Sequence, residues 1–69
     1  MVEKLANRLR EAREARGWTQ AQLADAIGVS RKTVNTVENG IFVPSTLIAL
    51  KLAQALGQPV EALFLIVEE

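Results

Sequence analysis

The sequence contains no cysteine and no histidine, only two prolines, and a single tryptophan among three aromatic residues. Without cysteine or histidine, the chain cannot form a disulfide scaffold, a zinc finger, or a catalytic pair built on a thiol or an imidazole. It also lacks the run of about 18 apolar residues that a membrane-spanning helix requires, and no signal-peptide pattern opens it. These absences favour a cytoplasmic protein that is not an enzyme and needs no metal or cofactor.

The residues that are present suffice for one domain over residues 1–69. The hydrophobic fraction is 49%, which is enough for a folded core and argues against disorder. The formal net charge is zero, which taken alone argues against a nucleic-acid partner. The charge is nevertheless uneven, because residues 1–40 carry a net +2 and residues 41–69 a net −2. A basic first half permits binding to an acidic partner without demonstrating it.

Apolar spacing and capping residues predict five short helices, and therefore an all-α fold around one core. The first is expected over about 4–16, where Leu5, Leu9 and Ala12 recur at helical spacing before Gly17. Gly28 supplies the turn between the second helix and the third. The other four helices are each preceded by a residue suited to a helix start and are expected at about 20–27, 31–38, 46–56 and 60–64.

The end of the chain does not follow a helical period. Residues 63–67 form a continuous apolar run: Leu63, Phe64, Leu65, Ile66 and Val67. A core this small cannot bury such a run on both sides, so we expect a tail packed over the core, or a short C-terminal strand or patch that pairs with another chain. Of these, we favour a homodimer contact through the run over packing within the chain.

Residues 20–38 have the pattern of a helix-turn-helix. Apolar residues stand where two crossing helices touch, namely Leu23, Ala24, Ile27, Val29, Val34 and Val37. Ala24 is small where the helices approach each other, and Gly28 allows a sharp turn. In such a unit the second helix protrudes and enters the major groove of DNA.

This pattern resembles the DNA-binding domains of the Cro/C1 repressor (XRE) family of helix-turn-helix regulators. The likeness runs from about Leu5 to Phe64 and includes "GWTQAQLA" before the turn, "GVSRKTV" after it, and "ENG" at the end of the third helix. The family implies a lambda-repressor-like five-helix fold and sequence-specific binding to double-stranded DNA, usually as a homodimer. The chain is similar to short, single-domain members, which typically repress or otherwise regulate a neighbouring operon.

The resemblance places the base-contacting residues on the third helix, at Arg31, Lys32, Asn35 and Thr36. Arginine and lysine donate to guanine, asparagine pairs with adenine, and a threonine methyl meets the thymine methyl. The alternative for these side chains is a solvated polar helix face. Contacts to the DNA backbone are implied for Thr19, Gln20, Thr33 and Asn39 and for the main-chain amides of Gly40 and Ile41.

Three further features concern the first helix and its surroundings. Arg13 and Glu38 correspond to a charged pair that in the family links the first helix to the end of the third; the alternative is local pairing of Arg13 along its own helix. Trp18 replaces the family's usual aliphatic residue, and we expect it to fill the core rather than to donate to a phosphate. The remaining arginines of the first helix favour a solvated face, although Arg8 and Arg10 are placed to extend a phosphate track.

Two functions stay open on the sequence. The first is a transcriptional repressor that reads a palindromic operator as a homodimer, and the basic, polar helix at 31–38 favours it. The second is an antitoxin or adaptor that uses the same fold to bind a protein partner. The zero net charge and the apolar segments 41–43 and 63–67 favour this alternative, since Ile41 and Phe42 stand where the family usually has polar residues.

Overall fold

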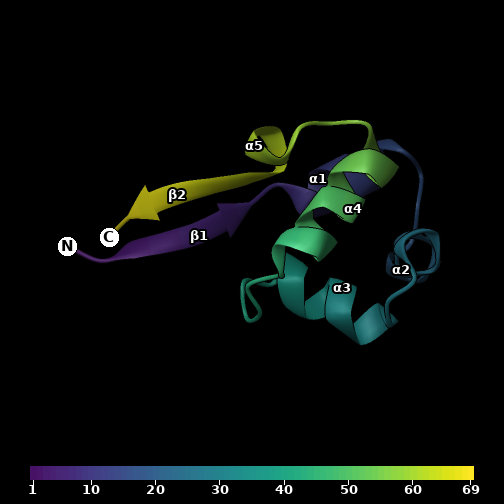
Figure 1. Ribbon diagram of the computed structural model, residues 1–69, viewed down its shortest axis with the longest axis horizontal. Helices are drawn as coiled ribbons and strands as arrows, with labels where there is room; N and C mark the ends of the chain where they lie inside the picture. The colour runs from purple at the N-terminus through teal and green to yellow at the C-terminus, as the bar shows by residue number, and fades with distance from the viewer.

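The computed structural model describes all residues, 1–69, as five helices and a two-stranded antiparallel sheet (Figure 1). The helices form a body from which the two strands project along the long axis, with both termini at the far end (Figure 1). We call the paired strands the ribbon. In chain order the elements are β1 (Glu3–Asn7), α1 (Leu9–Ala15), α2 (Gln20–Ile27), α3 (Arg31–Glu38), α4 (Thr46–Leu56), α5 (Val60–Leu63) and β2 (Phe64–Glu68).

The ribbon corrects the expected first helix. Residues 4–7 belong to a strand, so the fold contains the five expected helices but is not purely α-helical. The spacing of Leu5 and Leu9 is compatible with a helix, but the backbone of β1 is satisfied by pairing with β2 instead. The side-chain oxygen of Asn7 accepts a hydrogen bond from the N–H of Leu9 at 3.1 Å, and α1 starts there.

The apolar run at the end of the chain pairs with residues of the same chain. Leu5 lies opposite Ile66 in the register of β1 and β2. Leu63 is fully buried and Phe64 is 8% exposed, so the side chains of both belong to the core and are not free for the expected dimer contact. Ile66 is 69% exposed and lies outside the core, as do its two neighbours in β2.

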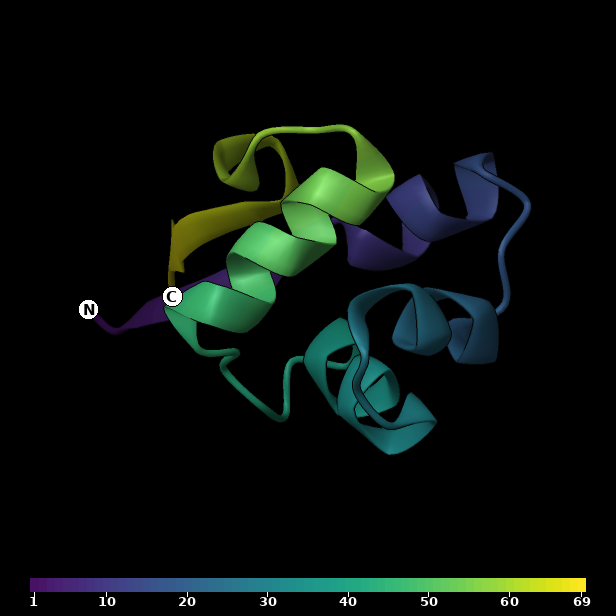
Figure 2. The ribbon, with the colours of Figure 1, turned by 45° about the vertical axis from the view of Figure 1, so that its right-hand side comes forward.

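The helix-turn-helix has the expected bounds, and its caps explain them. Thr19 and Gln22 form a capping box at the start of α2, each side chain bonding the other's backbone N–H. Ser30 caps α3 by accepting from the N–H of Thr33. Between the two helices Gly28 has φ 73°, a left-handed conformation that residues with a Cβ atom disfavour. The turn brings α3 against α2, as Figure 2 shows.

The core lies among all five helices. It is one cluster of 12 buried apolar residues, six of which are almost completely inaccessible to solvent: Leu9, Leu23, Val34, Val37, Leu52 and Leu63. Val34 and Val37 anchor α3 in this cluster, so the opposite side of α3 faces solvent. Trp18 packs against the cluster as a partly buried residue, and the guanidinium of Arg16 lies 4.6 Å from its ring centre.

Candidate nucleic-acid interface

The outward side of α3 carries the four side chains assigned to base contacts. Arg31 and Lys32 are exposed in the first turn, while Asn35 and Thr36 are half-buried one turn later. The hydroxyl of Thr36 donates back to the backbone oxygens of Lys32 and Thr33, both at 3.0 Å. That bonding commits the hydroxyl and leaves the methyl group as the part of Thr36 that is free for an apolar contact.

A buried ion pair holds the C-terminal end of α3. The Nε of Arg13 lies 2.6 Å from one carboxylate oxygen of Glu38, and its Nη2 lies 3.1 Å from the other. The Glu38 side chain is completely inaccessible, and the Arg13 side chain is 10% exposed. Arg13 also donates to the backbone oxygen of Trp18 at 2.8 Å. The cross-helix arrangement is therefore present, and it ties α1 and the start of α2 to α3.

The surroundings of this pair shift both pKa values. Burial raises the pKa of Glu38, but hydrogen bonds from Arg13, Gln20 and Arg10, together with the positive charge of Arg13, outweigh burial and hold that pKa below its ordinary value. The hydrogen bond to Glu38 raises the pKa of Arg13, against the opposing effect of its own burial. Both side chains are therefore charged at neutral pH, as a bidentate arginine–carboxylate pair requires.

Gln20 joins the ion pair to the outward side of α3. Its side-chain nitrogen donates to Glu38 at 3.2 Å, and its side-chain oxygen accepts from Asn35 at 3.4 Å. The family resemblance implied that the Gln20 amide donates to a phosphate and braces the recognition helix; within the chain this amide bonds Glu38 and Asn35 and so orients Asn35. One of its two N–H groups has no partner within the chain, so one donor remains for a ligand.

The loop after α3 uses its backbone amides within the chain. The N–H of Gly40 donates to the backbone oxygen of Val37 at 3.1 Å, and the N–H of Ile41 donates to that of Thr36 at 2.9 Å. Both amides are thus bonded to the end of α3 within the chain, and phosphate binding by them stays a prediction. The Asn39 side chain is exposed but is bonded at both ends, to the Asn35 backbone and to Arg10.

Two positioning residues were missed by the sequence reading. Arg10, which was assigned to a solvated face, reaches Glu38 at 3.5 Å and Asn39 at 3.2 Å. Its place three residues before Arg13, on the same face of α1, is the signal that could have identified it. Asn7 donates from its side chain to the backbone oxygen of Val37 at 2.9 Å. Nothing in the local sequence indicates that contact, because it depends on where the ribbon meets α3.

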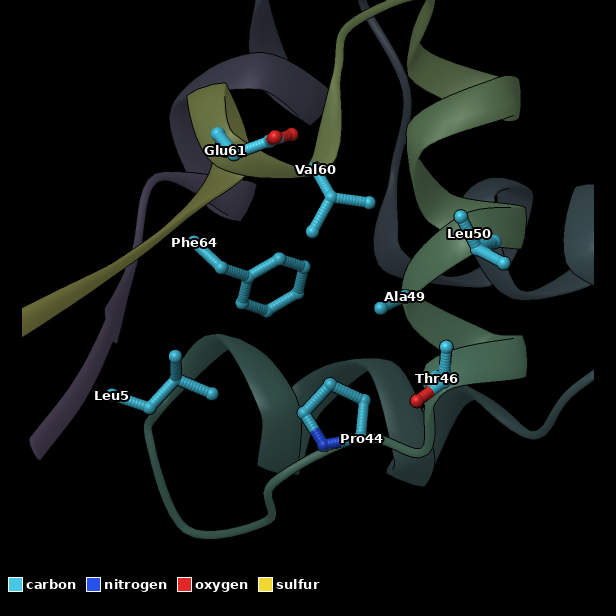
Figure 3. A pocket seen from close by; sticks show the side chains of 8 residues that line it. All are labelled: Leu5, Pro44, Thr46, Ala49, Leu50, Val60, Glu61 and Phe64. Carbon is cyan, nitrogen blue, oxygen red and sulfur yellow. The ribbon is translucent and has the colours of Figure 1, made fainter.

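An apolar groove of about 450 Å³ lies where the ribbon joins the helices (Figure 3). Leu5 and Phe64 enter it from the ribbon, and Ala49, Leu50 and Val60 from α4 and α5, while Glu61 is its only charged residue. The groove is therefore a surface for an apolar contact, separate from the polar side of α3.

No group of acidic side chains in the chain is arranged to hold a metal ion. None of the helices is long and apolar enough to cross a membrane.

Comparison with known proteins identifies the family. The helix-turn-helix family profile matches residues 9–63. The HTH-type transcriptional regulator YgzD of Bacillus subtilis is 38% identical over 65 residues, covering 94% of this chain and 98% of the relative. The crystal structure of the restriction-modification controller protein C.AhdI from Aeromonas hydrophila is 42% identical, with a TM-score of 0.76 over 80% of this chain and 83% of that one. Antitoxin HipB of Escherichia coli is 36% identical over 53 residues, which are 77% of this chain and 56% of HipB. The chain therefore belongs to the Cro/C1-type (XRE) helix-turn-helix family of DNA-binding transcriptional regulators.

Proposed function

We propose that the chain reads a palindromic operator as a homodimer, with α3 in the major groove, and acts as a repressor by occupying the operator. The observation that carries this proposal is the outward side of α3, where two exposed basic residues precede Asn35 and Thr36. The opposite side of the same helix is anchored by Val34 and Val37. A helix that is buried on one side and rich in hydrogen-bonding groups on the other suits insertion into a groove of DNA.

Each side chain on α3 has a role within this proposal. Arg31 and Lys32 donate to the O6 and N7 atoms of guanine, and Asn35, oriented by Gln20, pairs with adenine. The methyl of Thr36 meets a thymine methyl, because its hydroxyl is already bonded to the helix backbone.

Backbone contacts would come from the start of α2 and the flanks of α3. Thr19 caps α2, whose first N–H groups and positive dipole end are suited to a phosphate. Gln20 retains one free donor there, and Thr33 and Asn39 present polar groups at either end of α3. These neutral groups position the chain on the duplex without sequence preference. Contacts of lysine and arginine to phosphate release counterions, so binding should weaken steeply as the salt concentration rises.

The proposal is tested by selecting binding sites from random DNA. Wild-type protein should enrich a two-fold symmetric motif. The Arg31→Ala and Asn35→Ala variants should each lose about 1–3 kcal/mol of binding free energy on that motif. Each variant should also show a weaker preference for the base at one position of the motif. Lys4→Ala is the matched control, because it removes one positive charge from the ribbon, where Lys4 makes only an exposed ion pair with Glu69. Equal losses for the α3 variants on random DNA would contradict base reading.

A second candidate function, an antitoxin or adaptor that binds a protein partner, rests on the loop between α3 and α4. Ile41 and Val43 are 76% and 68% exposed there, and Phe42 is 44% exposed. The relationship to antitoxin HipB gives this reading further support. If it holds, Val43→Ser should abolish binding of a co-purified partner while operator binding by the chain alone is unchanged. A gel shift with the chain's own upstream region, with and without that partner, measures both.

A further inference from the structure

The hydrogen bonds of the ribbon alternate in a way that defines its outer edges. Val2 and Glu69 exchange both backbone hydrogen bonds, at 3.1 and 2.9 Å, and the N–H of Arg8 donates to Leu63 at 2.8 Å. In an antiparallel pair every second position is hydrogen-bonded, so Leu5 and Ile66 form a non-bonded pair. Their N–H and C=O groups therefore point away from the ribbon, one set along each outer edge.

The two edges differ in how readily another strand can add to them. Along β2 the outward backbone groups belong to Phe64, Ile66 and Glu68, and of these only the N–H of Phe64 is used, by the oxygen of Val60. Four consecutive apolar residues, 64–67, form most of this edge. The edge of β1 carries Glu3 and Lys4, and charged residues on an edge strand oppose the addition of a further strand. The edge of β2 is thus the one open to pairing.

We propose that a second copy of the chain pairs antiparallel along β2, with the two-fold axis at Ile66, to give a continuous four-stranded sheet. This specifies the interface of the homodimer proposed above and rests on that proposal. Ile66 would exchange two hydrogen bonds with Ile66 of the second copy, and Glu68 of each copy would donate to Phe64 of the other. These four bonds use the outward groups that the ribbon leaves unpaired.

The same pairing covers exposed apolar side chains. Residues directly opposite each other share a face of a sheet, so Leu5 and Ile66 of both copies would form one apolar row. Ile66 is 69% exposed in the single chain and would be covered by its counterpart. The row continues into the apolar groove, because Leu5 and Phe64 line that groove from the same face of the ribbon (Figure 3).

The length of the ribbon gives room for pairing along its side. Five residues per strand at about 3.3 Å each make the ribbon about 17 Å long. A two-fold axis through Ile66 leaves α3 of both copies on the same side of the joined sheet, as reading two half-sites on one face of a duplex requires.

Dimeric regulators of this kind read half-sites about one turn of B-DNA apart, roughly 34–36 Å. Asn7 couples the interface to this spacing, since its bond to Val37 joins the base of the ribbon to the last turn of α3.

The interface is tested by engineered cysteines, because the natural chain has none. In the proposed sheet the two Ile66 Cα atoms would be about 5.5 Å apart, within the range that a disulfide spans. We expect Ile66→Cys to form a covalent dimer when treated with oxidised glutathione, detected on a non-reducing gel, and to keep operator binding. Leu5→Cys is the matched control on the other edge and should stay monomeric on that gel.

Three further outcomes would overturn the pairing. Cross-linking of Leu5→Cys as readily as Ile66→Cys would contradict the choice of edge. A wild-type dimer in sedimentation with no cross-link at Ile66 would leave the homodimer in place but move it to another surface. A wild-type monomer that selects a single half-site would overturn both the homodimer and this interface, and would leave base reading by α3 intact.

A second variant does not depend on disulfide geometry. Ile66→Lys places two like charges opposite each other across the axis and changes an exposed side chain only. It should weaken dimerisation roughly tenfold or more in sedimentation, with unchanged helical content by circular dichroism. Dimerisation equal to that of the wild type would refute the interface.

Discussion

Replacing Glu38 with glutamine tests whether the buried ion pair positions α3. The substitution keeps the shape of the side chain and removes its charge, which leaves the guanidinium of Arg13 at 10% exposure without a counter-ion. Glutamine also brings an N–H₂ group to a site where Arg13, Gln20 and Arg10 are all donors. One hydrogen bond of the pair can survive, through the glutamine oxygen, and the other is lost.

Removing the charge of one partner of a buried ion pair lowers the free energy of unfolding by about 3–5 kcal/mol. Because one hydrogen bond is retained, we expect Glu38→Gln to lower it by about 3 kcal/mol. Total stabilities of roughly 0.05–0.15 kcal/mol per residue imply about 3–10 kcal/mol for a chain of this size, so the loss is a large share. In a domain of this length it corresponds to a fall in melting temperature of roughly 12–24 °C. Operator affinity should fall roughly tenfold as well, because the end of α3 is no longer fixed.

Urea unfolding followed by the fluorescence of Trp18, the single tryptophan, measures the stability difference. Operator affinity is compared at a temperature at which circular dichroism shows the variant folded. Glu11→Gln is the matched control, since Glu11 is an exposed glutamate on α1 that makes no ion pair. If Glu38→Gln had the stability and the operator affinity of the wild type, the positioning role of the pair would be refuted.

The same pair predicts how stability depends on pH. The pKa of Glu38 in the folded chain lies below its ordinary value of 4.5, so its contribution to stability is fully present above that value. As the pH falls from about 4.5 through the folded-state pKa, this contribution is lost. As the pH falls, the free energy of unfolding of the wild type should therefore approach that of Glu38→Gln. A difference in unfolding free energy that stays constant down to the lowest pH would contradict the lowered pKa of Glu38.

Other parts of the fold give further expectations, each measured by urea unfolding. Gly28→Ala should lower the free energy of unfolding by about 1–2 kcal/mol. The cause is the left-handed backbone alone, since an added Cβ meets no atom within 4 Å. Gly28→Asn should recover part of this loss. Leu52→Ala should lose about 2–5 kcal/mol by leaving a cavity, without altering base preference in site selection. Asn7→Ala should lose about 1–3 kcal/mol and also broaden the spacing between selected half-sites; an unchanged spacing would show that Asn7 does not link the ribbon to α3.

The helix-turn-helix was predictable because its signals are local. Thr19, Ser30 and Gly28 act within one turn of their own positions, by capping or by adopting a left-handed conformation. Val34 and Val37 are placed on one side of α3 by helical periodicity alone, which also exposes the residues assigned to base contacts. The bounds of α2 and α3 therefore follow from short stretches of sequence.

The ribbon was not predictable by the same reasoning, because its two strands are separated by the whole helical body. Leu5 stands at a helical spacing from Leu9, and only pairing with residues 64–68 makes residues 3–7 a strand. The same long-range pairing decides that Leu63 and Phe64 are buried while Ile66 is exposed.

The sequence by itself thus determined the helices, the turn at Gly28 and the polar character of the outward side of α3, since caps, glycine conformation and periodicity act over a few residues. Only the tertiary structure decided that residues 3–7 are a strand, that Gln20 is bonded to Glu38, and that Asn7 reaches Val37. Those features depend on contacts between elements distant in the chain. Their geometry is set by how the helices pack and not by any local preference.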